Sequence, residues 1–499
     1  MRLTFDQAIE AARERAAHID LDGLRRAGVY LRPLEYYLVG TYPPLKAMGP
    51  ADPSQVLAGA SANCNIYVHL PFCEQQCTFC HFAKEIRPQA SRVTRYLDAL
   101  HRDIAMTTER VGGPRRAHSA YFGGGTPSYL EPQELAALFD QLWQHVELDD
   151  AAEVTFELHP GLVRHADYGE RIDAVRERGA NRFVFGVQSM DEQVLATINR
   201  GHGRGEVFAM LDILGERGID NVNVDLIYGL PHQTLENWYA TIAVLLDAGL
   251  RKFNVFPLMF KHSDPVTHLF SKSPELFPSE EDRLLMHLMA EAILHAEGFQ
   301  RGPVLYYAKT ATHSRQQESK FDDIEDTNLL PFGVSGFGYV GGTQFYNECR
   351  LTPYIDAVER GEQPIWRAAT LSDDERMRRA MMFGLRSKGI DRAAFAARFG
   401  VDPLERFSEQ LGRLGDLGVL NVGERTIAPS DDGSVFVDGM ALQFVSDEVK
   451  QTVGRRNESI ANPKQDPIDR HDYSPLGRTN VPGGIGTRRA RRELELKGA

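Results

Sequence analysis

The sequence predicts an α/β fold in which a partial (β/α)6 TIM-type barrel is followed by a small C-terminal winged-helix-like α+β domain. Two observations carry this prediction. From residue 64 to about residue 260, short apolar or β-branched runs alternate with helical stretches, the pattern of repeated βα units on a parallel sheet. Between residue 371 and residue 448, three helical stretches precede a hairpin-like pair. In barrels of this kind the active site lies at the C-terminal ends of the strands.

Six candidate strands define the barrel. In chain order they are Asn65–Leu70, Ser119–Phe122, Glu153–Leu158, Arg182–Gln188, Val222–Ile227 and Lys252–Pro257. Each interval between them leaves room for a helix, for example Glu131–His145 or Glu192–Asn199. Motifs that directly follow these strands are therefore the first places to look for function.

Segments on both sides flank the predicted core at residues 61–370. Residues 1–60 form an N-terminal extension whose aromatic run, Tyr36–Pro44, we expect to cover the barrel mouth. The C-terminal domain, residues 371–448, is predicted to contain helices at Asp373–Arg386, Ala393–Phe399 and Leu404–Leu417, then a hairpin-like pair through Leu420 and Val435 around Pro429–Gly433. Residues 449–499 are poor in apolar side chains and are predicted to be a disordered tail, with Arg488–Arg492 as a solvated cluster.

Composition describes an ordinary globular protein, with 42% hydrophobic and 25% charged residues. The net charge of -13 argues against a nucleic-acid partner, because such proteins usually present basic faces to phosphates. No apolar run approaches the roughly 18 to 20 residues needed to cross a bilayer. The first twenty residues are too charged for a signal peptide. We expect a cytoplasmic protein without a membrane partner.

Three cysteines narrow the chemistry more than any other feature. Cys73, Cys77 and Cys80 follow the first candidate strand at C-x3-C-x2-C spacing. A four-iron four-sulfur cluster normally takes four cysteines. Three local thiolates would therefore leave one iron to bind something other than nearby protein, and a chelating cofactor is the obvious candidate.

Three close cysteines can also bind zinc or form disulfides. A structural zinc site closes with a fourth Cys or His, and His81 is adjacent, but the spacing lacks the paired C-x2-C halves of zinc knuckles. Disulfides are less favoured, because five cysteines in 499 residues is the usage of a reducing compartment. The zinc alternative stays open on spacing alone.

Glycines and polar residues lie at the ends of the next candidate strands. Gly123–Pro127 ends the second strand, and its glycines would let the backbone approach a ligand closely. Glu157 closes the third strand, where a carboxylate can accept hydrogen bonds from ribose hydroxyls. Gln188, Arg200 and Asp225 follow, and buried charges at such places are expensive unless paired. We expect the side chains of Gln188, Arg200 and Asp225 to contact either a ligand or one another.

The cysteine motif, with Phe79 before its last cysteine, resembles the signature of radical S-adenosylmethionine (SAM) enzymes. The resemblance implies a [4Fe-4S] cluster whose open iron binds the amino and carboxylate groups of SAM. An electron from a donor such as flavodoxin or ferredoxin would then cleave SAM to methionine and a 5′-deoxyadenosyl radical. Gly124, Gly125 and Thr126 match the strand end that touches the methionine amino group in these families.

As a set, five segments resemble one branch, the oxygen-independent coproporphyrinogen III dehydrogenase-like (HemN-like) group. They are Tyr67–Cys73, Tyr121–Pro127, Phe185–Ser189, Asp225–Pro231 and Phe383–Asp391, so the resemblance covers roughly residues 60–445. It implies a pocket that can hold two SAM molecules. It places Tyr67, Phe79, Gly124 and Glu157 near one or other SAM, and Thr126, Gln188, Arg200 and Asp225 around the second.

These five segments indicate the branch but do not by themselves specify the reaction. The coproporphyrinogen enzymes carry a further cysteine two residues after the last ligand, where this chain has Phe82. We therefore expect a class C methyltransferase or cyclopropanating enzyme that uses a second SAM on an sp2 carbon of a natural-product or tetrapyrrole substrate. The alternatives are coproporphyrinogen III oxidation and haem chaperoning. A general base is needed for methyl transfer, and His69, His159 and Tyr339 are the candidates.

Overall fold

The computed structural model describes most of the chain. Its described residues are 2–29, 40–60, 63–113, 115–261, 264–309, 314–322, 327–459 and 466–472. Tyr36 and Tyr37 of the aromatic run and the basic cluster at Arg488–Arg492 lie outside them.

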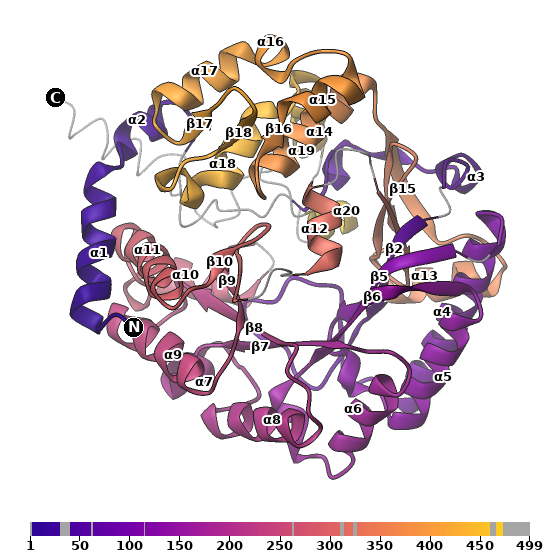
Figure 1. The fold of residues 1–499 in the computed structure, drawn as a ribbon. Coiled ribbons are helices and arrows are strands. Elements are labelled where there is room, and N and C mark those ends of the chain that lie inside the picture. Colours follow the sequence, from indigo (N-terminus) through magenta and orange to yellow (C-terminus); the bar gives the residue numbers. More distant parts are fainter. Residues whose placement is uncertain are drawn as a thin grey trace.

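Six neighbouring parallel strands form the barrel (Figure 1). They are β2 (Asn63–Leu70), β5 (Arg115–Gly124), β6 (Val146–Leu158), β7 (Arg182–Gln188), β8 (Val222–Tyr228) and β9 (Lys252–Pro257). The predicted partial (β/α)6 fold is confirmed. Because all six strands run the same way, their C-terminal ends meet at one edge of the sheet, and that edge collects the motifs singled out above.

The sheet continues beyond the barrel strands on both sides. Next to β9 lie β11 (Tyr306–Ala308) and β10 (Gln300–Arg301) in antiparallel pairing. Next to β2 lies β12 (Asn328–Phe332), which is parallel to it. Antiparallel strands then complete that side: β13 (Phe337–Val340), β14 (Thr343–Asn347), β15 (Ile365–Thr370) and β1 (Gly49–Pro50).

Helices cover the outer face of the barrel (Figure 1). They are α4 (Ala90–Arg110), α5 (Pro132–Trp143), α6 (Tyr168–Arg176), α7 (Glu192–Thr197), α8 (Arg204–Glu216), α9 (Leu235–Asp247), α11 (Glu280–Ala296) and α13 (Leu351–Glu359). Helix α10 (Pro265–Lys272) lies by Thr78, and α12 (Arg315–Asp322) lies on the inner side of the sheet, where Nδ2 of Asn65 donates to the Ser319 hydroxyl at 2.6 Å. In α4, Val93, Leu97, Leu100 and Ile104 recur at helical spacing and are buried, so one apolar stripe faces the sheet.

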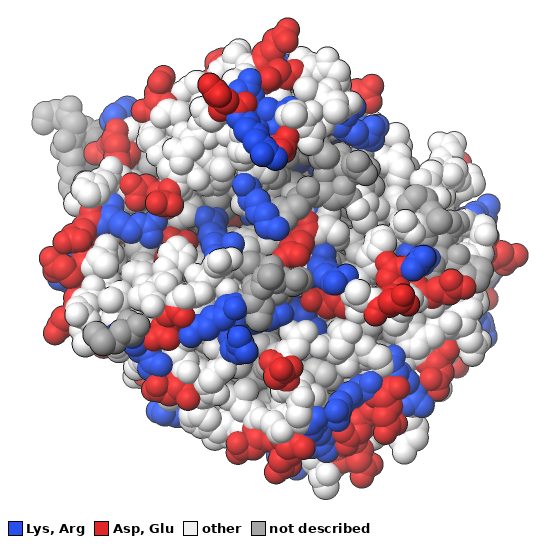
Figure 2. Space-filling model, in the orientation of Figure 1, with Lys and Arg blue, Asp and Glu red and all other residues white. Residues whose placement is uncertain are grey.

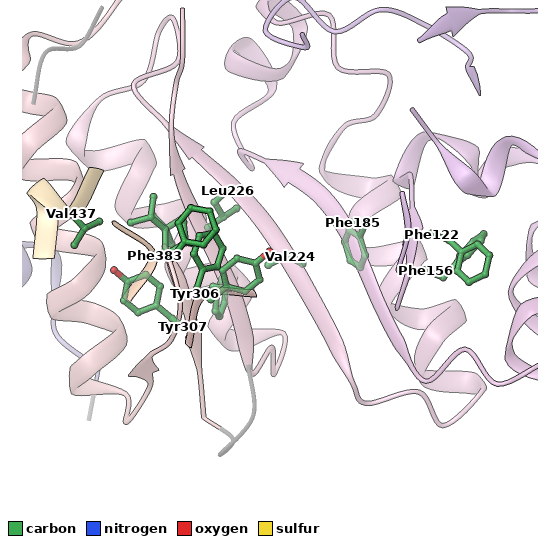
Figure 3. Close-up of a cluster of buried hydrophobic side chains, with 14 of the residues drawn as sticks. Phe122, Phe156, Phe185, Val224, Leu226, Tyr306, Tyr307, Phe383 and Val437 are labelled. Atoms are coloured by element: carbon green, nitrogen blue, oxygen red, sulfur yellow. The ribbon is translucent and has the colours of Figure 1, made fainter. Parts of the chain in front are cut away.

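Aromatic side chains fill much of the core between sheet and helices. Phe122 of β5 stacks on Phe139 of α5, with ring centroids 4.1 Å apart, and Phe156 of β6 packs beside both. Figure 3 shows Phe122, Phe156 and Phe185 in line along successive strands. Their alternation with cavity-facing residues follows from the two-residue period of a strand.

No described residue of the N-terminal extension lines the cavity at the C-terminal ends of the barrel strands; of the run Tyr36–Pro44, expected to cover the barrel mouth, residues 36–39 lie outside the described part. Helix α1 (Phe5–His18) starts with a Thr4 capping box and lies outside α11, where Arg15 donates to Glu291 at 3.0 Å. After α2 (Leu21–Arg26), the Tyr42 hydroxyl donates to Glu375 of the C-terminal domain. Helix α3 (Pro53–Val56) precedes β2. The extension therefore ties the barrel to the C-terminal domain.

The C-terminal domain combines helices with a three-stranded antiparallel sheet. Its elements are α14 (Asp373–Leu385), β16 (Ile390–Asp391), α15 (Arg392–Phe399), α16 (Pro403–Arg406), α17 (Ser408–Asp416), β17 (Leu420–Val422), β18 (Thr426–Pro429) and α18 (Val437–Ala441). The strand order is β16-β18-β17.

Two details of this domain differ from the prediction. The hairpin turns at residues 423–425, because β17 pairs with β18, and Val435 lies in a 3-10 turn instead of a strand. The Pro429–Gly433 run ends the strand because proline lacks the amide hydrogen that a ladder needs. The predicted helix at Leu404–Leu417 is interrupted at Phe407 and becomes α16 and α17.

The expectation of a disordered tail from residue 449 is wrong for the described residues. Helix α19 (Asp447–Ser459) buries Val449 and Val453, and α20 (Pro467–His471) buries Ile468. The low apolar content of this segment did not predict these helices, because a few apolar residues at helical spacing are enough to pack a polar helix against the protein.

Charge is spread over the surface. On the face shown in Figure 2, Lys and Arg side chains lie among Asp and Glu side chains. No helix of the described residues is both long and apolar enough to cross a membrane.

Candidate functional site

One cavity of about 320 Å³ gathers most of the residues that the sequence singled out. It opens at the C-terminal ends of the barrel strands, where sites in such folds lie. Of the predicted residues, those in its lining are Cys73, Cys77, Phe79, Cys80, Gly124, Gly125, Thr126, Glu157, His159, Gln188, Arg200 and Asp225. Tyr67, His69 and Tyr339 are not in the lining.

The three cysteines sit on a loop that is anchored at both ends. Cys73 ends β3 (Phe72–Cys73), which pairs in parallel with β4 (Glu85–Ile86) after the loop. In the middle, the amide of Thr78 donates to the carbonyl of Ile198 at 2.9 Å. The loop is therefore held against the end of α7, and its cysteines face the cavity.

The arrangement of the cysteines fits a cluster better than a single ion. Among the described residues, no group of three or more His, Cys, Asp or Glu side chains converges closely enough to hold one metal ion. In an iron-sulfur cluster each cysteine binds a different iron, so the thiols stand apart. This geometry argues against the zinc alternative, which needs converging ligands.

Burial makes the thiols of Cys73 and Cys80 hard to ionise while no metal is bound. It raises the pKa of Cys73 to about 12, against the opposing effect of the Thr126 hydroxyl. The pKa of Cys80 is also raised by burial, although the Lys84 charge acts against this. Iron must therefore displace protons when it binds, as in other thiolate sites.

Each cysteine has a hydrogen-bond donor or a cation beside it. The Thr126 hydroxyl donates to Sγ of Cys73 at 3.6 Å, and Nη1 of Arg200 donates to Sγ of Cys77 at 3.4 Å. Nζ of Lys84 donates to the carbonyl of Cys80 at 2.7 Å. These contacts favour negatively charged sulfur, because hydrogen bonds to a charged form stabilise it.

The glycine turn brings β5 against the start of the cysteine loop. Gly124 has φ of +120°, and a Cβ on Gly125 would stand 2.7 Å from the carbonyl carbon of Pro71. The amide of Gly125 donates to the carbonyl of Leu70 at 2.8 Å. Only glycine allows this approach of two backbones. It also positions Thr126 over Cys73.

Two buried carboxylates lie on the cavity wall. Glu157 accepts hydrogen bonds from the Tyr121 hydroxyl at 2.6 Å and from the Gly124 amide at 3.2 Å, and burial raises its pKa. Asp225 accepts from Nδ2 of Asn254 at 2.6 Å. Burial and the neighbouring Glu157 charge raise the pKa of Asp225 to about 7. The wall therefore favours hydrogen-bond donors or a positive charge in the cavity.

Gln188 and Arg200 complete the cavity with unsatisfied polar atoms. Gln188 has φ of +68°, in the left-handed region, and its buried Oε1 makes no hydrogen bond. Nη2 of Arg200 donates to the carbonyl of Gly186 at 2.6 Å, while its buried Nε has no partner. Strain and unpaired buried polar atoms at one place are features of ligand sites.

The three base candidates have different surroundings. His69 contacts the Tyr67 hydroxyl through Nδ1 and the Ala83 carbonyl through Nε2, both at 3.0 Å, and burial lowers its pKa to about 4. Tyr339 is buried under the Arg379 guanidinium, 3.8 Å from its ring centroid. His159 does reach the cavity, and burial and the Arg200 charge lower its pKa. Of the three, only His159 stays a candidate base.

Several lining residues were not predicted. They include Tyr121, Arg164, Asn254, Phe256, Met259 and Tyr306. Tyr121 alternates with the core residue Phe122 on β5, so strand periodicity could have found it. Tyr306 comes from β11, an antiparallel strand after the barrel, and no motif in the sequence marks it.

Residues 67–245 match the family described as the radical SAM superfamily, and residues 371–436 match the HemN C-terminal domain. The haem chaperone HemW of Bacillus subtilis is 27% identical over 74% of this chain and 96% of its own length. The anaerobilin synthase of Escherichia coli O157:H7 is 30% identical over 60% of this chain and 66% of its own length.

A solved structure is also similar. Coproporphyrinogen III oxidase (HemN) from Escherichia coli, titled a radical SAM enzyme, has a TM-score of 0.69 and 25% sequence identity. The alignment covers 78% of this chain and 92% of that chain. These names favour coproporphyrinogen oxidation or haem handling, and they do not support the methyltransferase subtype expected from the sequence.

Proposed function

This chain is a radical SAM enzyme that carries a HemN C-terminal domain, and we propose that it oxidises a tetrapyrrole-type substrate as coproporphyrinogen III oxidases do. One observation carries the proposal. A single cavity joins the three cysteines to the glycine turn, both carboxylates, Gln188 and Arg200. The similarity to the Escherichia coli oxidase extends over nearly all of that chain.

The cofactors of this superfamily are a [4Fe-4S] cluster and SAM, and the residues present fit both. Cys73, Cys77 and Cys80 would hold the cluster. When bound and reduced, the two cofactors supply a 5′-deoxyadenosyl radical that removes a hydrogen atom from the substrate. The cavity wall offers Glu157 to ribose hydroxyls and Arg200 to a carboxylate, and the unsatisfied atoms of Gln188 and Arg200 would find partners there.

Room for a second SAM is part of the proposal. Asp225 lies beyond Glu157 on the next strand but one, and its hydrogen bond from Asn254 leaves Oδ2 for a ligand. Holding two cofactors and a substrate in register is mainly a positioning task, and positioning can contribute roughly 7 to 11 kcal/mol to a reaction.

The rest of the cavity suits a flat acidic substrate. Apolar and aromatic side chains form one part of the wall, among them Phe79, Phe256, Met259 and Tyr306. Lys84 and Arg164 supply positive charge, and the Arg164 side chain is 54% exposed while it pairs with Glu74 at 3.0 Å. Such a wall can stack a ring and hold carboxylates at its edge.

The proposed net reaction converts a propionate side chain to a vinyl group. A hydrogen atom leaves the carbon next to the ring, carbon dioxide leaves the carboxylate, and the remaining electron passes to an acceptor. Lys84 and Arg164 would orient the carboxylate before it is lost. The cavity would keep water from the reacting carbon, since its wall is mostly apolar.

The test is an anaerobic assay of the iron- and sulfide-reconstituted protein with dithionite, SAM, coproporphyrinogen III and an electron acceptor. We expect 5′-deoxyadenosine and carbon dioxide in equal amounts, with a substrate mass loss of one formic-acid equivalent per side chain. A Cys77→Ser variant is the control and should give neither product. Stoichiometric haem uptake without 5′-deoxyadenosine would instead assign haem chaperoning.

Methyl transfer is the second candidate, and one observation favours it. Phe82 stands where the coproporphyrinogen enzymes carry a further cysteine, and it lines the cavity. In this case the second SAM would donate a methylene carbon to an sp2 carbon, and His159 would accept the proton that leaves. Formation of S-adenosylhomocysteine together with 5′-deoxyadenosine separates this reaction from oxidation, which forms no homocysteine product.

A further inference from the structure

A second cavity, of about 330 Å³, borders the cysteine loop from the other side. Cys80, His81, Phe82 and Lys84 line both cavities. The segment 80–84 is therefore the wall between the active-site cavity and this outer one. The remaining outer lining includes Cys349 and Arg350, just after β14, and Arg470 and His471 of α20. No strand or helix intervenes between the outer cavity and Cys80.

An exposed aromatic ring stands at the edge of this cavity. Phe82 is 52% exposed, more than any other large hydrophobic side chain that the structure describes. The ring of its neighbour His81 lies 5.1 Å from the Phe82 ring, centroid to centroid, and Nδ1 of His81 is 3.6 Å from Asp264. An exposed ring next to a concave surface is typical of protein contact sites.

Positive charge surrounds the ring. Lys84, Arg350 and Arg470 line the outer cavity. In this lining the acidic residue is Asp264, which lies 3.6 Å from His81; Arg350 pairs with Glu348, outside the lining, at 2.7 Å. Burial together with the charges of Lys261 and Arg470 lowers the pKa of His471 to about 3, which records a positive potential there. The whole chain carries -13, so this patch departs from its overall charge.

We propose that Phe82, Lys84, Arg350 and Arg470 form the docking site for flavodoxin, an acidic one-electron carrier. We name these four residues the donor patch. Reductive cleavage of SAM needs one electron from outside, and the inner side of the cysteine loop is taken up by the active-site cavity. An electron that enters from the outer side of the loop has the short path to Cys80.

Flavodoxin fits the donor patch in shape and charge. Its flavin exposes a flat aromatic edge, which can pack against Phe82, while its acidic rim would face Arg350 and Arg470. In the transfer, the fully reduced flavin is oxidised by one electron and the cluster is reduced by one electron. This inference rests on the proposed SAM cleavage, but its readout is cluster reduction and not product.

The first test measures the rate at which reduced flavodoxin bleaches the reconstituted enzyme in an anaerobic stopped-flow instrument. We expect Arg470→Glu combined with Arg350→Glu to slow this rate at least tenfold, and to weaken its decrease with added salt. Dithionite, which needs no docking, should reduce the variant at the wild-type rate. Arg425→Glu is the control for the two replacements made singly, because Arg425 is 88% exposed on the distant β17–β18 turn and each of these changes reverses one charge.

A second test begins with cross-linking of the unmodified enzyme, so this readout does not depend on how a variant folds. Zero-length cross-linking of flavodoxin carboxylates should join Lys84, and Phe82→Ala should slow flavodoxin-driven reduction while dithionite stays effective. Cross-links confined to distant lysines such as Lys388 or Lys450 would overturn the proposal. Equal slowing by Arg425→Glu would overturn it too, and so would a ferredoxin that reduces the double variant and the wild type alike while flavodoxin reduces neither.

Discussion

At the scale of single residues, hydrogen-bond donors beside the cysteine sulfurs distinguish this site from a loop that offers cysteines alone. Thr126 and Arg200 each reach one sulfur, from the end of β5 and from the turn after α7. Hydrogen bonds to ligand sulfurs raise the reduction potential of iron-sulfur clusters, because the reduced state carries more negative charge. We therefore expect these side chains to raise the reduction potential of a bound cluster, besides any contact with SAM.

Removing the Thr126 hydroxyl should make the cluster harder to reduce. For Thr126→Val we expect the midpoint potential to fall by about 20 to 60 mV, the equivalent of about 0.5 to 1.5 kcal/mol for one electron. The measurement is an EPR-monitored redox titration without SAM. Thr126→Ser keeps the hydroxyl and should restore the wild-type potential; an unchanged potential in Thr126→Val would show that the contact is inert.

The carboxyl group of Asp225 should make the stability of the cluster-free protein depend on pH. Its pKa is raised to about 7 in the folded protein, against about 3.9 unfolded. The folded state thus keeps a proton that the unfolded chain loses between these values, so stability falls as pH rises from about 4 to about 7. Asp225→Asn removes this loss.

We expect Asp225→Asn to be more stable than the wild type at pH 8, by about 2 to 4 kcal/mol, and equal to it near pH 4. Urea unfolding of the cluster-free protein at both pH values measures the difference. Asp247→Asn, at a side chain that is 69% exposed, is the control and should show no such pH-dependent gain. A gain of the same size at both pH values would argue against the titration of Asp225.

At the scale of elements, the turn after β5 and the cysteine loop act as one unit. Gly125 donates to the Leu70 carbonyl, and the same stretch of backbone places Thr126 by Cys73. A side chain on Gly125 would meet the Pro71 backbone at 2.7 Å, which a rotamer change cannot relieve. The glycine requirement therefore belongs to the packing of two strand ends and not to the turn alone.

Gly125→Ala should separate these two strand ends. We expect a loss of about 1 to 3 kcal/mol in unfolding free energy, together with reduced iron incorporation on reconstitution. Gly205→Ala is the matched control: Gly205 lies in α8 with nothing within 4 Å of an added Cβ, so the change should be neutral or stabilising by up to about 1 kcal/mol. Normal iron content in Gly125→Ala would contradict the coupling.

At the scale of the whole molecule, one buried carboxylate joins three parts of the chain. Glu291 of α11 accepts hydrogen bonds from Arg15 of α1 at 3.0 Å, from Tyr307 of β11 at 2.8 Å and from Ser434 of the C-terminal domain at 2.9 Å. Although burial alone would raise it, the pKa of Glu291 is lowered well below its usual range by the hydrogen bond and charge of His287, followed by nearby arginines.

Neutralising Glu291 should loosen this junction. We expect Glu291→Gln to cost about 3 kcal/mol at neutral pH, because it leaves the partly buried Arg15 guanidinium without its counter-charge. The stabilising effect is present above the unfolded pKa of about 4.3 and is lost as pH falls, so the difference from wild type should narrow in acid. Urea unfolding gives both values. Glu280→Gln, at a 40% exposed side chain, should change stability by less than about 1 kcal/mol.

The six barrel strands and the cavity residues at their C-terminal ends followed from the sequence because both depend on local order. A strand reads as a short β-branched run, and parallel strands bring their ends together whatever the detailed packing. Eight of the nine cofactor candidates, all except Tyr67, line one cavity for this reason. Tyr67 lies lower on β2, opposite Tyr121, and is covered by its neighbours.

Other features depend on contacts between segments far apart in the sequence. His69 is held away from the cavity by the contact of its Nε2 with the carbonyl of Ala83. Helix α19 folds because Val449 and Val453 are buried against the rest of the protein. The donor patch likewise joins residues 82 and 84 to Arg350 and Arg470. No run of sequence contains these pairs, so no pattern could show them.

The sequence by itself determined the chemistry that the cavity can start: three cysteines at fixed spacing after a strand, with glycines and acidic side chains after the next strands. Spacing along one loop is enough to specify a cluster-binding motif. Tertiary structure alone decided which side chains hydrogen-bond to the sulfurs, which histidine reaches the cavity and which face of the cysteine loop is open to a partner. Those properties are set by distances between strand ends, and folding brings these ends together.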